Sequence, residues 1–329
     1  MAARIRAEGP LTFDQWVEAC LYDPQDGFYS SGGSAGRRGD FITSPEVGPL
    51  FGTVLANWID KVWANLGSPK DFVVLETGAG PGTLARSILK AKPKSLINGR
   101  YIAIERSEIQ RKLHPAEAES LPSFPEESIT GVVLANELLD NLPFRLCRGD
   151  GEKWRETLIT EGFKEIIGNE VGLPLSLPPI EGAKIPIQTK ASNWVQDALD
   201  IVDQGAVLVF DYCSTTSQMA NEPQSEWLRT YRGHEKGNNP IANPGSQDIT
   251  VNVALDQLPG EFSANSQAEF LTSHGIKELV KEGRRIWEKQ AHIGGLEAIE
   301  ARSRITESEA LLDPNGLGGF TTLEWLISH

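Results

Sequence analysis

The chain has 329 residues, of which 40% are hydrophobic and 23% are charged, and its formal net charge is −14. This composition is typical of a globular protein with a substantial core, organised as one large α/β domain with an accessory part or as two domains. The negative charge argues against a nonspecific nucleic-acid binder, which needs a basic surface. A basic protein would suit this charge as a substrate, although many soluble proteins are simply acidic.

Cysteine, histidine and hydropathy patterns argue against a disulfide-stabilised, metal-binding, membrane-spanning or secreted protein. The three cysteines, at positions 20, 147 and 213, form no close pairs, which argues against a disulfide framework or a cysteine zinc site. The five histidines show no metal-ligand spacing, so no metal is expected. No segment approaches the roughly 18 to 20 continuous apolar residues of a membrane span, and no secretory signal is recognisable. We therefore expect reduced thiols, no membrane span and a cytoplasmic location.

The first 68 residues are predicted to form a helical and loop segment that caps a functional site. Residues 11–22 carry apolar side chains at helical spacing. Residues 27–39 are rich in glycine and serine, which favours a linker or a binding loop. Thr43-Ser44-Pro45-Glu46 is typical of a helix start, and this helix is expected to run to about Leu66.

Residues 69–213 alternate between expected strands and helices. The strands are continuous apolar runs, which indicates burial on both faces, because a half-exposed strand would alternate apolar and polar residues. We therefore expect an α/β fold with a doubly wound, mostly parallel, Rossmann-like sheet and a β-hairpin insertion at about 153–168. The expected strands are 72–75, 101–104, 131–135 and 206–210, and the expected helices include 83–91 and 191–202.

The remaining residues fall into two segments. Residues 214–250 are polar and rich in turns, and this length favours an active-site lid or an accessory insertion over an idle loop. Residues 251–329 are expected to add a further helix and the antiparallel strands that complete the sheet.

The most informative motif follows the first of these strands and reads Glu76-Thr77-Gly78-Ala79-Gly80-Pro81-Gly82. Strand, glycine turn and helix start follow one another, and glycines allow both a tight turn and the close approach of a ligand. Glu76 would repel a dinucleotide pyrophosphate but attract a ligand with an amino group and a sulfonium, such as S-adenosylmethionine. Helix-start amides would receive the ligand's carboxylate. We predict a cofactor site at Glu76, Gly78, Gly80 and Gly82; a glycine turn without a ligand is the alternative.

Glu105 ends the expected strand 101–104, 23 residues beyond Gly82 (105 − 82). In doubly wound nucleotide-binding folds, an acid at this position accepts hydrogen bonds from the ribose hydroxyls. We therefore add Glu105 to the cofactor-binding residues. A surface charge at a strand end is the alternative interpretation.

Polar side chains also follow the expected strand 131–135. Asn136 and Glu137 are expected to face the binding cleft, because ligands lie outside the carboxyl ends of the strands in such sheets. Asp140 lies one helical turn after Glu137 if the segment coils. Two carboxylates there could hold a guanidinium or ammonium group and orient its nitrogen towards a methyl group. Asn136, Glu137 and Asp140 are therefore the candidate catalytic residues, unless Asp140 only braces the turn before Pro143.

Together these motifs resemble the MidA family of class I methyltransferases. The matching segments include Gly27–Tyr29, Gly39–Glu46, Glu76–Leu84, Ala135–Pro143, Trp154–Glu156, Asp211-Tyr212, Leu228–His234 and Pro244–Thr250. The resemblance implies S-adenosylmethionine as cofactor and, through a mitochondrial member that assists complex I assembly, methylation of a protein arginine. The partner would then be a protein such as a respiratory-complex-type subunit, and a homodimer is considered.

Two details of the resemblance concern the expected helix start. Ser44 and Pro45, within the matching segment Gly39–Glu46, are counted among the cofactor-binding residues. Gly48-Pro49 stands where family members commonly carry a polar pair, so any substrate contact from this helix start is left open.

The sequence thus predicts an S-adenosylmethionine-dependent methyltransferase that acts on a protein side-chain nitrogen such as arginine. A nicotinamide-dependent Rossmann oxidoreductase is the alternative enzyme, but Glu76 and the absence of glycine at position 83 weigh against it. A catalytically silent assembly factor with the same fold is the third hypothesis. The presence of Glu76, Glu105 and Glu137 argues against a complete loss of function.

Overall fold

The computed structural model describes residues 1–30, 43–232, 235–290 and 295–328. The chain divides into two compact units, each of which collects three segments. Unit 1 comprises Met1–Phe41, Leu138–Asp197 and Asp211–Gly260, and unit 2 comprises Ile42–Glu137, Ala198–Phe210 and Glu261–His329. The four segments expected from the sequence follow chain order, whereas these units are assembled from distant parts of the chain.

Unit 2 is built around a seven-stranded sheet, counted over the described residues, in the order β16-β17-β10-β5-β2-β3-β4. The strands from β10 to β4 pair in parallel, and β16 pairs with β17 antiparallel. This arrangement confirms the expected doubly wound, mostly parallel sheet. The strands are β2 (Val73–Thr77), β3 (Arg100–Ile104), β4 (Glu119–Leu121), β5 (Ile129–Asn136), β10 (Val202–Asp211), β16 (Ser263–Ser266) and β17 (Thr321–Ile327).

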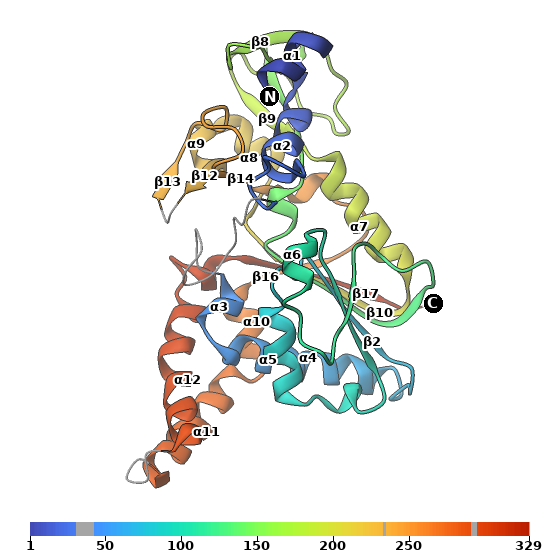
Figure 1. Ribbon diagram of the computed structural model, residues 1–329, viewed down its shortest axis with the longest axis vertical. Coiled ribbons are helices and arrows are strands. Elements are labelled where there is room, and N and C mark those ends of the chain that lie inside the picture. The colour runs from blue at the N-terminus through green and yellow to red at the C-terminus, as the bar shows by residue number, and fades with distance from the viewer. Residues whose placement is uncertain (31–42, 233–234, 291–294, 329) are drawn as a thin grey trace. The chain divides into compact units, whose positions relative to one another are not determined.

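The helices of unit 2 pack on this sheet through an aromatic core. The rings of Phe51 and Phe270 each meet the ring of Phe210 edge to face, with centroids 5.2 and 5.3 Å apart. Helices α11 and α12 lie side by side as a hairpin (Figure 1). The helical elements are α3 (Ser44–Val47), α4 (Pro49–Asn65), α5 (Thr83–Ala91), η1 (Lys94–Leu96), α6 (Glu108–Arg111), α10 (Gln267–Ser273), α11 (Ile276–Gln290), α12 (Leu296–Leu312) and η4 (Leu317–Gly319).

The helix expected from residue 43 to about residue 66 is wrong in one respect, because it is broken at Gly48. Gly48 is extended, with φ 164° and ψ −177°, so that α3 ends before it and α4 begins after it. Pro49 then occupies the first position of α4, where its missing N–H is not needed.

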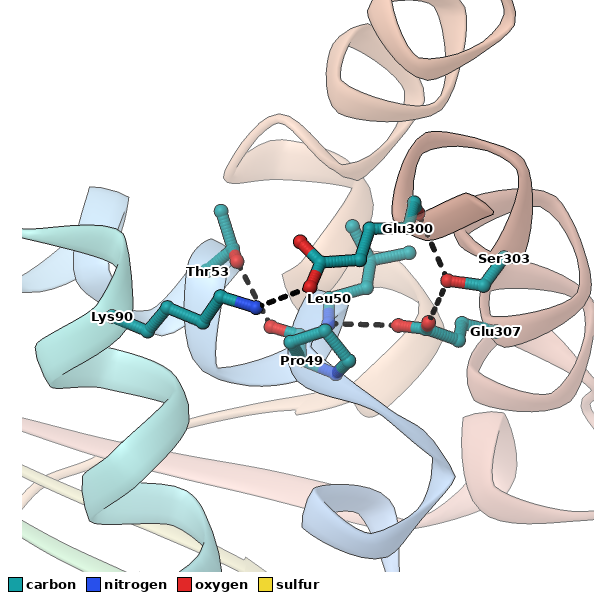
Figure 2. Close-up of polar contacts among 7 residues, drawn as sticks. All are labelled: Pro49, Leu50, Thr53, Lys90, Glu300, Ser303 and Glu307. Atoms are coloured by element: carbon teal, nitrogen blue, oxygen red, sulfur yellow. Dashed lines mark hydrogen bonds and ion pairs between the residues drawn. The ribbon is translucent and has the colours of Figure 1, made fainter. Parts of the chain in front are cut away.

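A carboxylate from α12 caps the start of α4, as Figure 2 shows. The Leu50 N–H donates a 2.8 Å hydrogen bond to Glu307 Oε2, and Ser303 Oγ donates to Glu307 Oε1 at 2.6 Å. A Cβ on Gly48 would lie only 2.2 Å from Glu307 Cδ. A side chain at position 48 would therefore force the buried Glu307 carboxylate to shift away from the start of α4, so glycine suits this position.

Unit 1 contains a second, antiparallel sheet in the order β1-β7-β6-β9, with β8 paired to β7. Strands β7 and β8 pair antiparallel in the stretch where a hairpin was expected. The core of this unit includes the fully buried Phe13, Trp16 and Trp227. The elements are α1 (Ala2–Glu8), β1 (Leu11–Thr12), α2 (Phe13–Tyr22), η2 (Leu139–Asn141), β6 (Arg145–Gly149), β7 (Trp154–Ile159), β8 (Glu165–Glu170) and β9 (Lys184–Ile187), with α7 (Thr189–Ile201) starting here and ending in unit 2.

The described residues between 214 and 250 form packed structure within unit 1. A three-stranded sheet in the order β13-β12-β14 lies in this stretch, and Trp227 and Asp248 are fully buried. Side chains of this stretch therefore contribute to the core of unit 1, which its polar composition did not indicate. The elements are β11 (Cys213–Ser214), α8 (Thr216–Asn221), α9 (Gln224–Trp227), β12 (Leu228–Arg232), β13 (Glu235–Gly237), β14 (Asp248–Val251), β15 (Val253–Ala254) and η3 (Leu255–Gln257).

Candidate functional site

The glycine motif forms the expected turn between β2 and α5 in unit 2. Gly78, Gly80 and Gly82 have φ values of 64°, 53° and 80°, a region that side-chain-bearing residues rarely adopt. A Cβ on Gly82 would approach Pro115 Cδ to 3.0 Å. The strand, glycine turn and helix start predicted from the sequence are therefore confirmed, and the positive φ values explain why glycine suits these three positions.

Glu76 lies on β2, just before the glycine turn, and is only 4% exposed. Its Oε2 accepts a 2.7 Å hydrogen bond from the hydroxyl of Tyr101 on β3. Burial raises the pKa of Glu76 to about 7, although the hydrogen bond from Tyr101 and the charge of Arg86 oppose this rise. A carboxyl group that changes charge near neutral pH thus lies beneath the glycine turn.

Glu105 follows β3 and joins the glycine turn to the next loop. Its Oε2 accepts a 3.0 Å hydrogen bond from the Gly80 N–H, and its Oε1 accepts a 2.7 Å hydrogen bond from the Ser107 N–H. Each carboxylate oxygen can accept more than one hydrogen bond, so Glu105 retains acceptor capacity for a ligand hydroxyl. The expected acid is therefore beside the glycine turn.

Sequence analysis missed two side chains that face the glycine turn. His114 Nε2 lies 2.9 Å from the Gly80 carbonyl oxygen, and its Nδ1 lies 2.9 Å from Ser120 Oγ. Gln110 Oε1 lies 3.2 Å from the position of a Cβ on Gly80. Neither residue belongs to a recognisable motif, and only the packing of the α6 region against the turn brings them there.

Ser44 and Pro45 are buried at the start of α3 in the same unit. Ser44 Oγ donates a 2.8 Å hydrogen bond to Gln267 Oε1, so its hydroxyl is engaged within the protein. The next residue, Glu46, accepts a 2.7 Å hydrogen bond from Thr83 Oγ1 at the start of α5. Glu46 thus links α3 to the glycine turn, a contact that the sequence did not indicate. Residues 39–42 of the matching segment lie outside the described residues.

Asn136 and Glu137 lie at the carboxyl end of β5, next to the glycine turn in the same sheet. The register pairs Thr77 of β2 with Ala135 of β5, so the two strands end at the same edge. Glu137 has φ 50°, a conformation that costs about 1 to 3 kcal/mol for a residue other than glycine. Such strain is frequent at functional sites, where it directs a side chain away from the regular strand direction.

The side chains of this strand end are partly committed to each other. Asn136 Nδ2 donates a 2.9 Å hydrogen bond to Glu137 Oε1, and the Glu137 N–H donates to the Phe210 carbonyl at 2.8 Å. Asn136 Oδ1 is buried and has no hydrogen-bond partner within the described part of the chain. A buried acceptor without a donor is costly, and a ligand that supplies an N–H or O–H group would satisfy it.

Asp140 belongs to unit 1 and lies in the short 3₁₀ helix η2. Glu137 and Asp140 would lie one helical turn apart only if the segment coiled, and this condition is not met, because Glu137 has a positive φ and η2 begins only at Leu139. Burial, together with the carboxylates of Asp211 and Asp248, raises the pKa of Asp140 well above its usual range. Its Oδ1 is buried and lacks a hydrogen-bond partner among residues that the structure describes.

Asp211 and Asp248 are two further acids of unit 1 that the sequence did not single out as site residues. Asp211 accepts hydrogen bonds from the backbone N–H groups of Leu139 at 2.9 Å and Tyr212 at 2.8 Å. Asp248 accepts hydrogen bonds from the hydroxyl of Tyr29 at 3.1 Å and from Asn141 Nδ2 at 3.0 Å. These partners commit both carboxylates to holding η2 and its surroundings in place.

Within residues 1–30, 43–232, 235–290 and 295–328, no three histidine, cysteine, aspartate or glutamate side chains gather as a metal site would require. Over the same ranges, no helix combines the length and the apolar character needed to cross a bilayer.

The family model described as "Putative S-adenosyl-L-methionine-dependent methyltransferase" matches residues 54–274, which contain the glycine turn, Glu105 and Glu137. Among solved structures, a Burkholderia thailandensis protein bound to S-adenosyl-homocysteine superposes with a TM-score of 0.81 and 25% identity, over 99% of this chain and 90% of that one. These matches confirm S-adenosylmethionine as the cofactor and the methyltransferase fold.

Curated relatives are similar over most of the chain. The rat protein arginine methyltransferase NDUFAF7 is 33% identical over 339 residues, which cover 84% of this chain and 74% of the relative. The Drosophila melanogaster homologue of the same name is 27% identical over 300 residues, which cover 77% of this chain and 67% of the relative.

The cytoplasmic location expected from the sequence is wrong by this comparison, because both relatives are named as mitochondrial proteins. The expectation rested on cysteine usage and on the lack of a recognisable membrane span or secretory signal, and Cys20, Cys147 and Cys213 form no disulfide with one another. Free thiols indicate a reducing environment, which does not identify one compartment.

Proposed function

Because the chain belongs to the family of S-adenosyl-L-methionine-dependent methyltransferases, we propose that it methylates a side-chain nitrogen of a protein, with arginine as the acceptor. The curated relatives that are named protein arginine methyltransferases support this acceptor. The observation that carries the proposal is the edge of the unit 2 sheet, where the glycine turn after β2 adjoins the strained Glu137 after β5. A cofactor site and an acceptor site at neighbouring strand ends fit a group transfer between two ligands.

The cofactor subsite is proposed at the glycine turn. The cofactor supplies an electrophilic methyl group on a sulfonium. Gly78, Gly80 and Gly82 leave the backbone open to close approach, and the amides at the start of α5 would receive a carboxylate. Glu76 would attract the amino group directly or through a water molecule, and Glu105 would accept hydrogen bonds from the ribose hydroxyls.

The acceptor subsite is proposed at Asn136 and Glu137. The Glu137 carboxylate would orient a guanidinium and offset its positive charge, while Asn136 Oδ1 would accept one of its N–H groups. Most of the catalytic effect would come from alignment of the acceptor nitrogen and from the exclusion of water. Asp140, which is assigned to unit 1, stays a predicted catalytic residue, and its buried Oδ1 has no partner in the described residues. Direct cofactor contacts by Ser44 and Pro45 likewise remain predictions.

A labelling experiment tests this proposal. The protein is incubated with methyl-labelled S-adenosylmethionine and a mitochondrial extract, and labelled peptides are identified by mass spectrometry. We expect label on arginine, and we expect Glu137→Gln to lower the labelling by at least about tenfold while S-adenosylhomocysteine affinity is retained. Label confined to small molecules would overturn the protein acceptor. Normal cofactor binding without any labelling would instead favour the silent assembly factor.

The oligomeric state is a separate part of the proposal. A homodimer stays a prediction, and light scattering of the purified chain at micromolar concentration distinguishes it from a monomer of 36.0 kDa.

A further inference from the structure

Tyr101 is a buried residue that no motif of the cofactor site includes. It lies on β3, its side chain is 2% exposed, and its hydroxyl is 2.7 Å from Glu76 Oε2. The strand register pairs Tyr101 with Val74, so its side chain reaches diagonally along the sheet to Glu76, two residues further on. The phenol therefore makes a specific buried hydrogen bond with the acid that precedes the glycine turn.

The surroundings of Glu76 set a balance between its neutral and charged forms. Burial raises its pKa to about 7, and the negative charge of Glu105 adds to this rise. The Tyr101 hydroxyl, the charge of Arg86 and the Ala85 backbone amide act in the opposite direction. On the other side, the register places the apolar Leu134 of β5 beside Glu76. Only the ionised carboxylate would attract the amino group of the cofactor, so this balance bears directly on binding.

We propose that Tyr101 is a positioning residue for cofactor binding, because its hydroxyl holds the Glu76 carboxylate ionised and oriented towards the amino group of the ligand. The inference rests on the proposed placement of the cofactor at the glycine turn. It makes binding proton-linked: below the pKa of the free protein's Glu76, binding requires the loss of a proton, and affinity falls by up to about tenfold for each pH unit.

The test compares two ligands that differ in the amino acid portion. S-adenosylhomocysteine carries the amino group, whereas methylthioadenosine keeps the adenosine and lacks the amino acid. In calorimetric titrations at pH 7, Tyr101→Phe should weaken S-adenosylhomocysteine about tenfold, as expected for the loss of a hydrogen bond to a charged group. The affinity for methylthioadenosine should change less than about twofold, because that ligand does not use Glu76.

A pH series supplies the second measurement. Wild-type affinity for S-adenosylhomocysteine should increase from pH 6 to pH 8 as Glu76 loses its proton, and Tyr101→Phe should shift this increase to higher pH. Affinity for methylthioadenosine should stay flat over the same range. Glu76→Gln should remove the pH dependence, and adding Tyr101→Phe to Glu76→Gln should cause no further loss, because the two residues act as one unit.

The outcomes separate the inference from the proposed function. Equal weakening of both ligands by Tyr101→Phe would assign it a structural role and overturn the inference. Unchanged S-adenosylhomocysteine affinity in Tyr101→Phe would overturn it as well, while leaving the cofactor site in place. Failure of the wild-type protein to bind either ligand would reject the placement of the cofactor itself, and the inference with it.

Discussion

Two buried carboxyl groups in unit 2 differ in how well the surrounding protein stabilises their ionised form. Glu307 is 5% exposed and lies at the start of α4, where it accepts hydrogen bonds from the Leu50 amide and the Ser303 hydroxyl. Glu76 is 4% exposed and lies at the carboxyl end of β2, where burial outweighs the hydrogen bond from Tyr101 and raises its pKa to about 7. The first region fixes the packing of α12, and the second leaves a carboxyl group whose ionised form a cationic ligand would favour.

The difference shows that burial of an acid does not by itself mark a functional site. At Glu307, a helix N-terminus provides the partner that a carboxylate needs, so the group stabilises the fold. At Glu76, the ionised form is disfavoured by the fold and would be favoured by an ammonium group. Substitutions in the two regions should therefore separate loss of stability from loss of binding.

The largest expected effect follows Gly80→Val in the Glu76 region. Gly80 has φ 53°, and a valine there would strain the turn and obstruct the approach of the cofactor. We expect S-adenosylhomocysteine affinity to fall by at least about 100-fold, or roughly 2.7 kcal/mol, in a calorimetric titration. Gly67→Val is the matched control, because Gly67 also has a positive φ, 80°, with open space around it. Equal affinities of the two variants would contradict the placement of the site.

Gly48→Ala tests the Glu307 region. The new Cβ would lie 2.2 Å from Glu307 Cδ, so we expect the free energy of unfolding to fall by about 1 to 3 kcal/mol. The loss should nearly vanish when Gly48→Ala is introduced into a Glu307→Ala background, because the clash is then absent. Urea unfolding of the four proteins measures this coupling, and additive losses would refute the steric account. S-adenosylhomocysteine affinity should remain within about twofold of wild type throughout.

Glu76→Gln should change how stability depends on pH. The folded pKa of Glu76, about 7, lies above the ordinary value of 4.5, so the folded state binds this proton more tightly than the unfolded state. The free energy of unfolding should therefore fall as pH rises from about 4.5 to about 7. Relative to wild type, Glu76→Gln should gain on the order of 1 to 3 kcal/mol between pH 5 and pH 8. Parallel pH profiles of the two proteins in denaturant titrations would count against a destabilising charge at Glu76.

The smallest effect is expected for Lys90→Ala, near the Glu307 region. Figure 2 shows the contact between Lys90 and Glu300. Lys90 Nζ lies 2.7 Å from Glu300 Oε1, but the two side chains are 59% and 53% exposed. Such an exposed ion pair contributes about 0 to 0.5 kcal/mol, and salt screens it further. Thermal unfolding at low and high salt should show little change, and a loss above about 1 kcal/mol would indicate that this pair anchors α12.

The parts of the site that could be predicted from sequence depend on patterns within a short stretch of chain, such as an apolar run followed by glycines. Glycine at three alternate positions after an apolar run forced a tight turn, and the helix after it was placed within its observed bounds, Thr83–Ala91. The strand ends that carry Glu105 and Asn136 followed from the apolar runs before them.

The missed features depend on residues far apart in the chain. At the break, Gly48 lies against Glu307, 259 positions later (307 − 48), whose carboxylate stands where a side chain at position 48 would begin. Likewise, the pairing of Tyr101 with Glu76 needs the register of β2 and β3. The positive φ of Glu137 means that the segment from Glu137 to Asp140 does not coil as one helical turn. The three-residue β4 escaped notice because its short, exposed sequence carries no apolar signal.

The central claim is that the cofactor binds at the glycine turn and that the Glu76 carboxylate binds its amino group. A crystal structure of the protein with S-adenosylhomocysteine tests it most directly. We predict the ribose hydroxyls at Glu105 and the ligand's amino nitrogen about 3 Å from the Glu76 carboxylate, or joined to it through one water molecule. A ligand bound away from the turn, or an amino group held by other residues with Glu76 left paired to Tyr101 alone, would contradict the account.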